Sequence, residues 1–237
     1  MLRFYAILVA VCLLGGIVSL CQSDKREKTG HEGRSYRDYP VWGLDLSRHQ
    51  PAVDWDKVLE IGAPDFVFLK ATEGTLIKDP IYRRRAEALD RKGIVRGAYH
   101  FFGHRTSGRE QAENFIRTAD LKPGNIIPVL DIEKHRFMTD GRRTVREAKA
   151  FCMEIKRHYG VMPIIYCSTL FYERYLQKDF SSRDYVLWIA DYRGNPDYLP
   201  WTFWQHTEKW ELHGTSGKVD RNVFAGTKEE LQKLVLK

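Results

Sequence analysis

The chain has 237 residues and a formal net charge of +7, and 43% of its residues are hydrophobic and 13% aromatic. This length suits one large domain or two small ones, and the apolar content is enough for a substantial core, so we exclude a chain that is disordered throughout. The basic residues are scattered and form no run interleaved with aromatics, so we expect no nucleic-acid partner.

The first 21 residues are predicted to be a targeting segment. A short positive start, Met1–Arg3, precedes an 18-residue stretch, Phe4–Cys21, that contains no charged side chain. This length lies on the border between a signal peptide and a membrane-spanning helix. The triplet "VSL" before Cys21 also resembles a lipoprotein signal, although Leu20 replaces the usual small residue. All three alternatives stay open, and each sends the rest of the chain out of the cytoplasm.

The remaining chain is therefore expected in the periplasm or cell envelope, either secreted or held at the membrane by residues 1–21 alone. Residues 22–39 are polar, without periodicity, and are predicted to be a linker. Residues 40–237 are predicted to form one domain, without internal repeats, that acts as a monomer. Its cysteines, Cys152 and Cys167, fall on an apolar helix face and an apolar strand. Two buried free thiols are the leading interpretation, and a single disulfide is the alternative.

Short apolar segments alternate with helical patterns after residue 40. The predicted strands are 41–47 ("VWGLDLS"), 65–70 ("DFVFLK"), 95–102 ("VRGAYHFF"), 125–133 ("NIIPVLDIE"), 162–168 ("MPIIYCS"), 185–190 ("YVLWIA") and 201–207 ("WTFWQHT"). The predicted helix boundaries are Asp79-Pro80 and Gly93 at the two ends of one helix, Ser107 and Thr227 at the starts of two others, and Gly160 at the end of a fourth.

This alternation of strands and helices predicts a parallel sheet whose strands are covered on both faces. Seven or more such units in about 200 residues favour a β/α barrel at the small end of its size range, with the active site at the C-terminal ends of the strands. An open doubly wound sheet is the rival. It is disfavoured because "LDLSRHQP" stands after the first strand, where a nucleotide-binding fold would have a glycine-rich loop.

Two acids, Asp131 and Glu133, follow the apolar run "IIPVL". Residues i and i+2 of a strand point to the same side, so their Cα atoms would lie about 6.5–7 Å apart at the active end of the barrel. Like charges at that distance raise the pKa of at least one of them. Glycoside hydrolysis needs such a pair, with one acid protonated and the other ionised. A pair of strand-end acids that only makes caps or salt bridges is the alternative.

Other strand ends carry more acids and aromatics. Asp45 and Asp191 each end an apolar run, and Asp220 follows a valine near the end of the chain. Sugar rings stack their C–H faces on aromatic side chains, while their hydroxyls hydrogen-bond to acids and amides. Each aromatic alone is more typical of a core, but acids and aromatics gathered at one barrel mouth indicate a carbohydrate substrate. The aromatics are Tyr99, Tyr166, Trp188 and Trp204.

An ordered set of segments resembles the glycoside hydrolase family 25 lysozymes. The segments are "GLDLSRHQ", "FVFLKATEGT", "GAYHFF", "PVLDIE", "PIIYCS", "LWIADY", "FWQHTE" and "GKVDRNVF", which span nearly all of residues 40–226 in matching order. The resemblance implies an N-acetylmuramidase with an irregular, reduced TIM-like β/α barrel, acting on peptidoglycan without a cofactor.

The resemblance also implies roles for individual residues. Glu133 would be the general acid, Asp131 would flank the sugar C2 substituent, and Asp45 and Asp220 would complete an acidic floor. Lys70 and Glu73 match a family element, which we interpret as an ion pair that holds a strand end. The substrate-binding set would be Tyr99, Tyr166, Trp188, Trp204, Gln205 and Asp191, with the role of Asp191 open because this acid departs from the family pattern.

Two mechanisms fit the acid spacing. It falls near the range of about 6.5–9.5 Å seen when water attacks with inversion, and exceeds the ~5–5.5 Å seen when a carboxylate is the nucleophile. In the second mechanism the substrate's own 2-acetamido oxygen attacks, Asp131 orients it, and configuration is retained. The resemblance favours this second mechanism.

Two other functions and a metal site are alternatives. A chitinase-like glycosidase would show a longer D-x-x-D-x-D-x-E run, and "IIPVLDIE" supplies only its last two acids. A non-catalytic wall-binding module would keep the aromatics without needing both Asp131 and Glu133. The histidines match no metal-binding spacing, so we expect no metal; they are His49, His100, His104 and His135.

Overall fold

The computed structural model describes residues 29–50, 52–134, 138 and 140–237. The predicted targeting segment, with its three alternatives, and the first part of the predicted linker lie outside these residues. Over the described part of the chain, no helix combines the length and apolar character that a membrane span requires.

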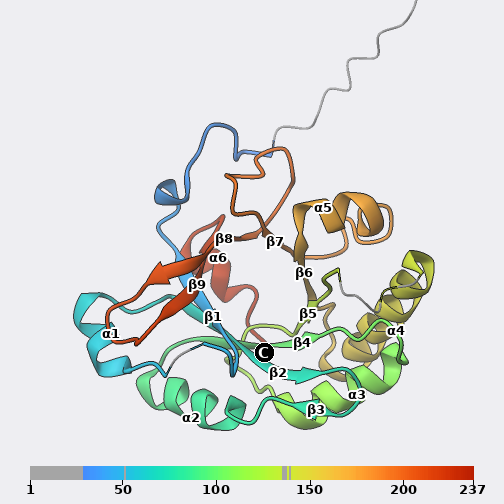
Figure 1. Cartoon of the computed structure of the whole chain (residues 1–237), viewed down its shortest axis with the longest axis horizontal. Coiled ribbons are helices and arrows are strands. Elements are labelled where there is room, and N and C mark those ends of the chain that lie inside the picture. Colours follow the sequence, from blue (N-terminus) through green and yellow to red (C-terminus); the bar gives the residue numbers. More distant parts are fainter. Residues whose placement is uncertain (1–28, 51, 135–137, 139) are drawn as a thin grey trace, which may run out of the picture.

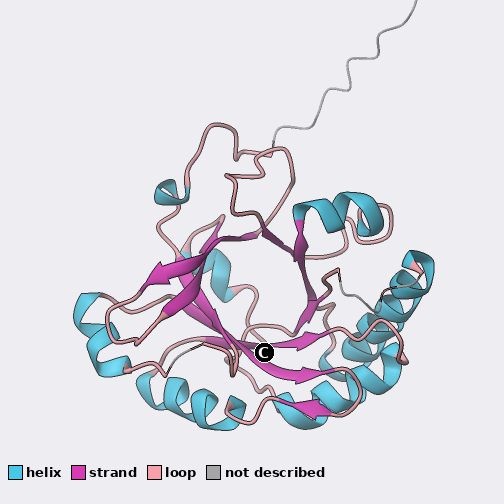
Figure 2. Ribbon diagram, viewed as in Figure 1, coloured by secondary structure: helices cyan, strands magenta, loops and turns pink. Residues whose placement is uncertain are grey.

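Eight strands close into a barrel (Figure 2). Their order around the barrel is β1-β9-β8-β7-β6-β5-β4-β2, and β2 pairs back to β1, while the short β3 pairs only with the edge of β2. The strands are β1 (Trp42–Leu46), β2 (Phe66–Glu73), β3 (Ile77–Lys78), β4 (Arg96–Phe101), β5 (Val129–Asp131), β6 (Ile164–Ser168), β7 (Leu187–Ala190), β8 (Phe203–Glu211) and β9 (Lys218–Phe224).

The barrel is mixed and not purely parallel. Its strands run parallel except β9, which is antiparallel to both β8 and β1. The expectation of a uniformly parallel sheet was therefore wrong for the end of the chain. The six residues between β8 and β9 are too few for the crossover that a parallel pair needs, so the two strands form a hairpin. The predicted irregular β/α barrel is otherwise confirmed.

The longer helices lie on the outside of the barrel (Figure 1). The helices are α1 (Trp55–Ile61), α2 (Tyr82–Lys92), α3 (Gly108–Ala119), α4 (Gly141–Tyr159), α5 (Thr169–Phe171) and α6 (Lys228–Gln232), with a 3₁₀ turn η1 (Tyr36–Asp38) and a π-helical turn η2 (Tyr172–Leu176). Ser107 and Thr227 cap α3 and α6 as predicted, and Gly93 and Gly160 end α2 and α4 with positive φ.

The predicted start of α2 was wrong by two residues. The helix begins at Tyr82 with Ile81 at the N-cap position. Asp79 is not the cap, because its carboxylate accepts the backbone N–H groups of Ile81 and Arg48 and so joins the helix entry to the loop after β1.

Aromatic rings fill the barrel interior. Phe68 contacts the rings of Phe66, Phe203 and Trp188 at centroid distances of 5.4, 5.4 and 4.6 Å. A Cβ atom at Gly43 would lie 2.5 Å from the Phe66 ring, so only glycine fits there. This packed layer closes the barrel below its C-terminal mouth. Cys152 and Cys167 are buried free thiols, as the leading interpretation held.

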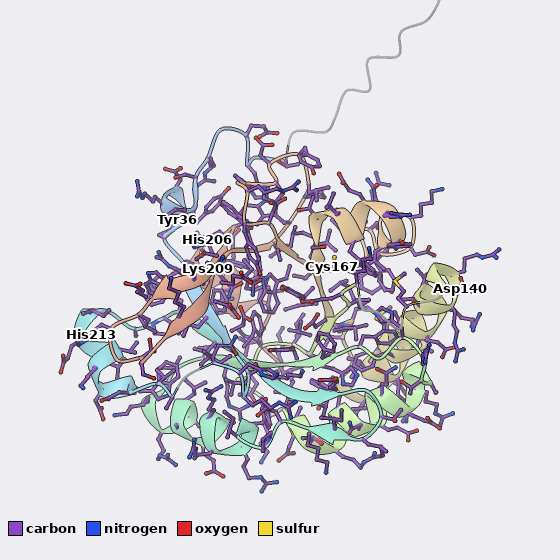
Figure 3. The ribbon with its side chains drawn as sticks, viewed as in Figure 1. Tyr36, Asp140, Cys167, His206, Lys209 and His213 are labelled. Atoms are coloured by element: carbon purple, nitrogen blue, oxygen red, sulfur yellow. The ribbon has the colours of Figure 1, made fainter. Side chains whose placement is uncertain are left out.

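Residues 29–39 pack on the domain, although they were predicted to belong to a polar linker. The His31 ring stacks on Trp201 with centroids 4.0 Å apart, and its Nε2 atom lies 3.0 Å from the Trp201 carbonyl oxygen. Tyr36 stacks on His206 at 4.3 Å, and the two labelled side chains lie together in Figure 3. The aromatic and imidazole rings of this segment were the signal for packing, and the surrounding charged residues obscured it.

Candidate active site

A cleft of about 930 Å³ opens at the C-terminal mouth of the barrel. It gathers residues from the ends of several strands that are far apart in sequence. Of the residues predicted for the site, those that line the cleft are Asp45, Asp131, Glu133, Asp220, Tyr99, Tyr166, Trp188, Gln205 and Asp191.

Trp204 is the predicted site residue that does not line the cleft. Its indole is 3% exposed, donates a hydrogen bond to the Asp191 carbonyl oxygen at 2.9 Å, and packs near Trp201. Adjacent residues of a strand point to opposite faces, so Gln205 and Trp204 cannot both face the cleft. Since the indole is buried and Gln205 lines the cleft, a contact between Trp204 and the saccharide stays a prediction.

Asp45 and Asp220 form an acid pair on the floor of the cleft. They lie opposite each other on the neighbouring strands β1 and β9. Burial raises the pKa of Asp45. Its Oδ2 atom accepts hydrogen bonds from Gln205 Nε2 at 2.7 Å and Asn222 Nδ2 at 2.8 Å, which act in the opposite direction and favour its ionised form. Burial and the Asp45 carboxylate raise the pKa of Asp220 to about 9. Asp220 therefore carries the proton that the pair shares.

The two amides that hold Asp45 are themselves fixed. Gln205 Oε1 accepts hydrogen bonds from the hydroxyls of Tyr166 at 2.8 Å and Tyr192 at 2.6 Å. Asn222 Oδ1 accepts the indole N–H of Trp188 at 2.8 Å. Trp188 lines the cleft although it is only 1% exposed, so its ring lies at the bottom of the cleft while its N–H group fixes the amide of Asn222. Both amides are thus oriented with their N–H groups toward Asp45.

Asp131 and Glu133 both line the cleft, while Ile132 between them is fully buried in the core. Burial, and then the charge of Glu133, raise the pKa of Asp131 well above its usual value. Burial and the charge of Asp45 raise the pKa of Glu133, while a hydrogen bond from Tyr166 and the charge of Lys70 act in the opposite direction. The two carboxyl groups therefore compete for protons at the end of one strand.

Lys70 and Glu73 form the ion pair that we expected at the end of β2. Their Nζ and Oε2 atoms lie 2.7 Å apart, and the strand register shifts between Lys70 and Thr72, which brings the two side chains together. Both residues line the cleft, and the Lys70 ammonium lies 4.6 Å from the Phe101 ring centroid. Lys70 thus places a positive charge near Asp131 and Glu133, which acts to lower the pKa of both against the effect of burial.

Asp191 lies at the rim of the cleft and forms an ion pair with Arg193, with Nη2 2.6 Å from Oδ2. Burial alone would raise the pKa of Asp191, but the hydrogen bonds from Arg193 lower it overall. Arg193, Tyr192, Asn222 and Gln50 are site residues that we did not predict. Asn222 could have been found, because it stands two residues from Asp220 on the same strand face.

Of the four histidines that we considered as metal ligands, the three that the structure describes lie in different surroundings. His49 lines the cleft, while His100 and His104 are buried in hydrogen bonds; His135 lies outside the described residues. Among the side chains that the structure describes, no group of three or more His, Cys, Asp or Glu is arranged to hold a metal ion.

The fold and the site together define a class of enzyme. A closed barrel with several carboxyl groups at the C-terminal ends of its strands, two of them at the end of β5 with raised pKa values, has the layout of a glycoside hydrolase.

Comparison with known proteins gives the family. The family described as "Glycosyl hydrolases family 25" matches residues 44–215, so the chain belongs to this family and is a glycoside hydrolase of the lysozyme type. This confirms the resemblance found in the sequence. Asp220 lies just beyond the matched residues, although its strand β9 pairs with β1 inside them.

Individual relatives agree. The chain is 35% identical to the uncharacterized protein YegX of Escherichia coli K12 over 204 residues, which are 83% of this chain and 74% of YegX. It is 29% identical to lysozyme M1 of Streptomyces globisporus over 207 residues, with 81% and 70% of the two chains covered. Among solved structures, a family 25 glycosyl hydrolase from Bacillus anthracis superposes with a TM-score of 0.76 at 29% identity, covering 83% of this chain and 94% of its own.

Proposed function

We propose that this enzyme hydrolyses the β-1,4 bond between N-acetylmuramic acid and N-acetylglucosamine in peptidoglycan. Its relatives include a lysozyme and two N,O-diacetylmuramidases, which supports this bond and this polymer. Because peptidoglycan lies outside the cytoplasm, the enzyme acts after export. The alternatives for how residues 1–21 bring this about are those drawn from the sequence.

The observation that carries the proposal is the pair Asp131 and Glu133 in the cleft. Glu133 is the general acid that protonates the leaving glycosidic oxygen, since burial and the charge of Asp45 raise its pKa and so favour the protonated form of its carboxyl group. Asp45 and Asp220 lie across the cleft floor, where their shared proton leaves a single negative charge near the developing positive charge on the sugar.

Asp131 orients the 2-acetamido group of the sugar. Its Oδ1 atom is buried and has no hydrogen-bond partner among the described residues. Asp131 also lines the cleft, so its carboxyl group can accept the N–H of an acetamido group that binds there. The acetamido oxygen would then attack C1 while the C1–O bond to the leaving sugar, protonated by Glu133, breaks. Water would open the resulting cyclic oxazolinium at C1, and the two inversions together retain the configuration. Proton NMR of the first-formed anomer tests this step, since an initial α-product from the β-linked substrate contradicts it.

The variant Glu133→Gln tests the assignment of the general acid. The amide keeps the size of the side chain and cannot donate the proton, so the turnover of purified peptidoglycan should fall by at least about 10²-fold while sedimentation binding to it persists. Glu208→Gln is the matched control, because Glu208 is an exposed acid that lines the same cleft. A Glu133→Gln enzyme with normal turnover would overturn the proposal.

A further inference from the structure

Glu133 lies beyond the last residue of its strand. The strand β5 ends at Asp131, whose carbonyl oxygen accepts the backbone N–H of Phe102 at 2.9 Å. If β4 and β5 continued to pair as parallel strands, a backbone N–H would next donate to the carbonyl oxygen two residues later, which is that of Glu133. The donor found there is the imidazole of His104, with Nε2 2.7 Å from the Glu133 carbonyl oxygen.

The imidazole of His104 takes the place of a ladder N–H. A carbonyl oxygen can only accept, so Nε2 carries the hydrogen in this contact. The loop after β4 therefore donates two hydrogen bonds to the end of β5 and the residues that follow it. The Asp131 carbonyl oxygen accepts one from the Phe102 backbone N–H, and the Glu133 carbonyl oxygen accepts the other from the His104 side chain. The hydrogen bond from His104 lies beyond Asp131, where the regular strand pairing of β5 has ended.

His104 is itself held rigidly. It is 6% exposed, and its Nδ1 atom lies 3.1 Å from Thr144 Oγ1 on α4. The Thr144 hydroxyl is also 3.1 Å from the carbonyl oxygen of Asp140, the residue that caps α4 (Figure 3 labels Asp140 at that end of the helix). The ring meets Phe102 edge-on at 5.8 Å. The burial of the ring and its contact with Phe102 keep the Nε2 donor beside the Glu133 carbonyl oxygen.

We propose that His104 is a positioning residue for the glycosidase reaction, holding the backbone of Glu133 so that its carboxyl group stays in the interior of the cleft. This inference rests on the proposed role of Glu133 as general acid. His104 does not touch the substrate in this role, and it acts only through the Glu133 carbonyl oxygen.

Loss of the Nε2 donor has two consequences. The Glu133 carboxyl group becomes free to shift by an ångström or so, which lowers kcat by about 10- to 100-fold while leaving KM nearly unchanged. It also gains contact with water, and a less buried carboxyl has a lower pKa. The basic limb of the kcat/KM profile, which reports loss of the acid's proton in the free enzyme, then moves to lower pH.

Two variants separate the Glu133 contact from the Thr144 contact. In His104→Gln the amide nitrogen reaches about as far as Nε2 and can still donate to the Glu133 carbonyl oxygen. In His104→Asn the shorter amide reaches only the Thr144 side. Both are compared with wild type and with Thr144→Val, which removes the bond at Nδ1 and keeps the donor at Nε2. The measurements are initial rates on dye-labelled peptidoglycan across pH, with the folded fraction taken from thermal unfolding.

His104→Asn is expected to lose about 10- to 100-fold in kcat with its basic limb moved to lower pH, while His104→Gln and Thr144→Val stay within about threefold of wild type with unmoved limbs. Equal activity per folded molecule in His104→Asn and wild type contradicts the inference. If His104→Asn does not fold, the test rests on His104→Gln. A large loss of kcat in folded His104→Gln then contradicts the inference that the Nε2 donor positions Glu133. A normally active Glu133→Gln enzyme would instead refute the proposed function.

Discussion

Replacing Asp220 by asparagine should stabilise the folded enzyme at neutral pH. The neighbouring Asp45 carboxylate and burial raise the pKa of Asp220 to about 9, so at pH 7 the folded chain must take up a proton that the unfolded chain lacks. An asparagine needs no proton. It can donate to Asp45 as the protonated acid does, and its oxygen can accept the Gln50 Nε2 hydrogen bond that Asp220 accepts at 3.0 Å.

The size of this effect follows from the pKa of an unfolded aspartate, about 3.9. Holding the carboxyl group protonated at pH 7 costs about 1.36 kcal/mol for each of roughly three pH units, which gives a ceiling of about 4 kcal/mol. Because Asp220 keeps some contact with water in the cleft, we expect a gain of about 1–3 kcal/mol for Asp220→Asn. For a domain of this size that corresponds to a rise in Tm of roughly 3–10 °C.

The pH dependence identifies the cause. An acid whose pKa is raised by folding stabilises the fold fully below its unfolded pKa and loses that contribution as the pH rises toward 9. The gap in Tm between Asp220→Asn and wild type should therefore widen with pH up to about pH 9, and at pH 4.5 it should be about a fifth of its size at pH 7. Glu208→Gln controls for the removal of a negative charge from the cleft. An Asp220→Asn enzyme that is less stable than wild type at pH 7, or a gap that does not change with pH, would refute the shared-proton pair.

Three further outcomes are expected. A chain that begins at residue 40 should have a Tm several degrees below that of a chain that begins at residue 29, because it loses the stacking of His31 and Tyr36 on the domain. Equal Tm values would show that residues 29–39 contribute nothing to stability. Asn222→Ala should lower stability by about 2–4 kcal/mol in urea unfolding and cut turnover at least tenfold, because Asp45 loses one of its two amide donors and the Trp188 indole N–H loses its acceptor. Wild-type turnover would contradict the role of this amide. Trp204→Phe should keep turnover within about threefold, and a large rise in KM would restore Trp204 to the substrate-binding set.

Strand periodicity predicted most of the barrel and the composition of its mouth. The acids at the ends of "VWGLDLS" and "NIIPVLDIE" do line the cleft, because the C-terminal ends of parallel strands meet at one end of a barrel. The same periodicity, applied strictly, would have excluded Trp204 once Gln205 was placed in the cleft, and would have found Asn222 from Asp220.

Other features depend on contacts between distant parts of the chain. The antiparallel direction of β9 follows from the short turn that joins it to β8. The segment that forms β9 was not among the predicted strands, so the length of this turn could not be used to predict the direction. Tyr192 and Arg193 stand in a loop without periodicity, so no pattern marked them. His104 meets the Glu133 carbonyl oxygen across 29 positions of sequence, and nothing in "GHRTSG" indicates that its imidazole completes a strand ladder.

Mass spectrometry of the fragments released from purified peptidoglycan by residues 29–237 tests the proposed function most directly. Cleavage of the bond named above leaves muramic acid at every new reducing end, and this product should be absent with Glu133→Gln. New reducing ends of N-acetylglucosamine, or fragments that differ from the starting polymer only in their peptides, would contradict it.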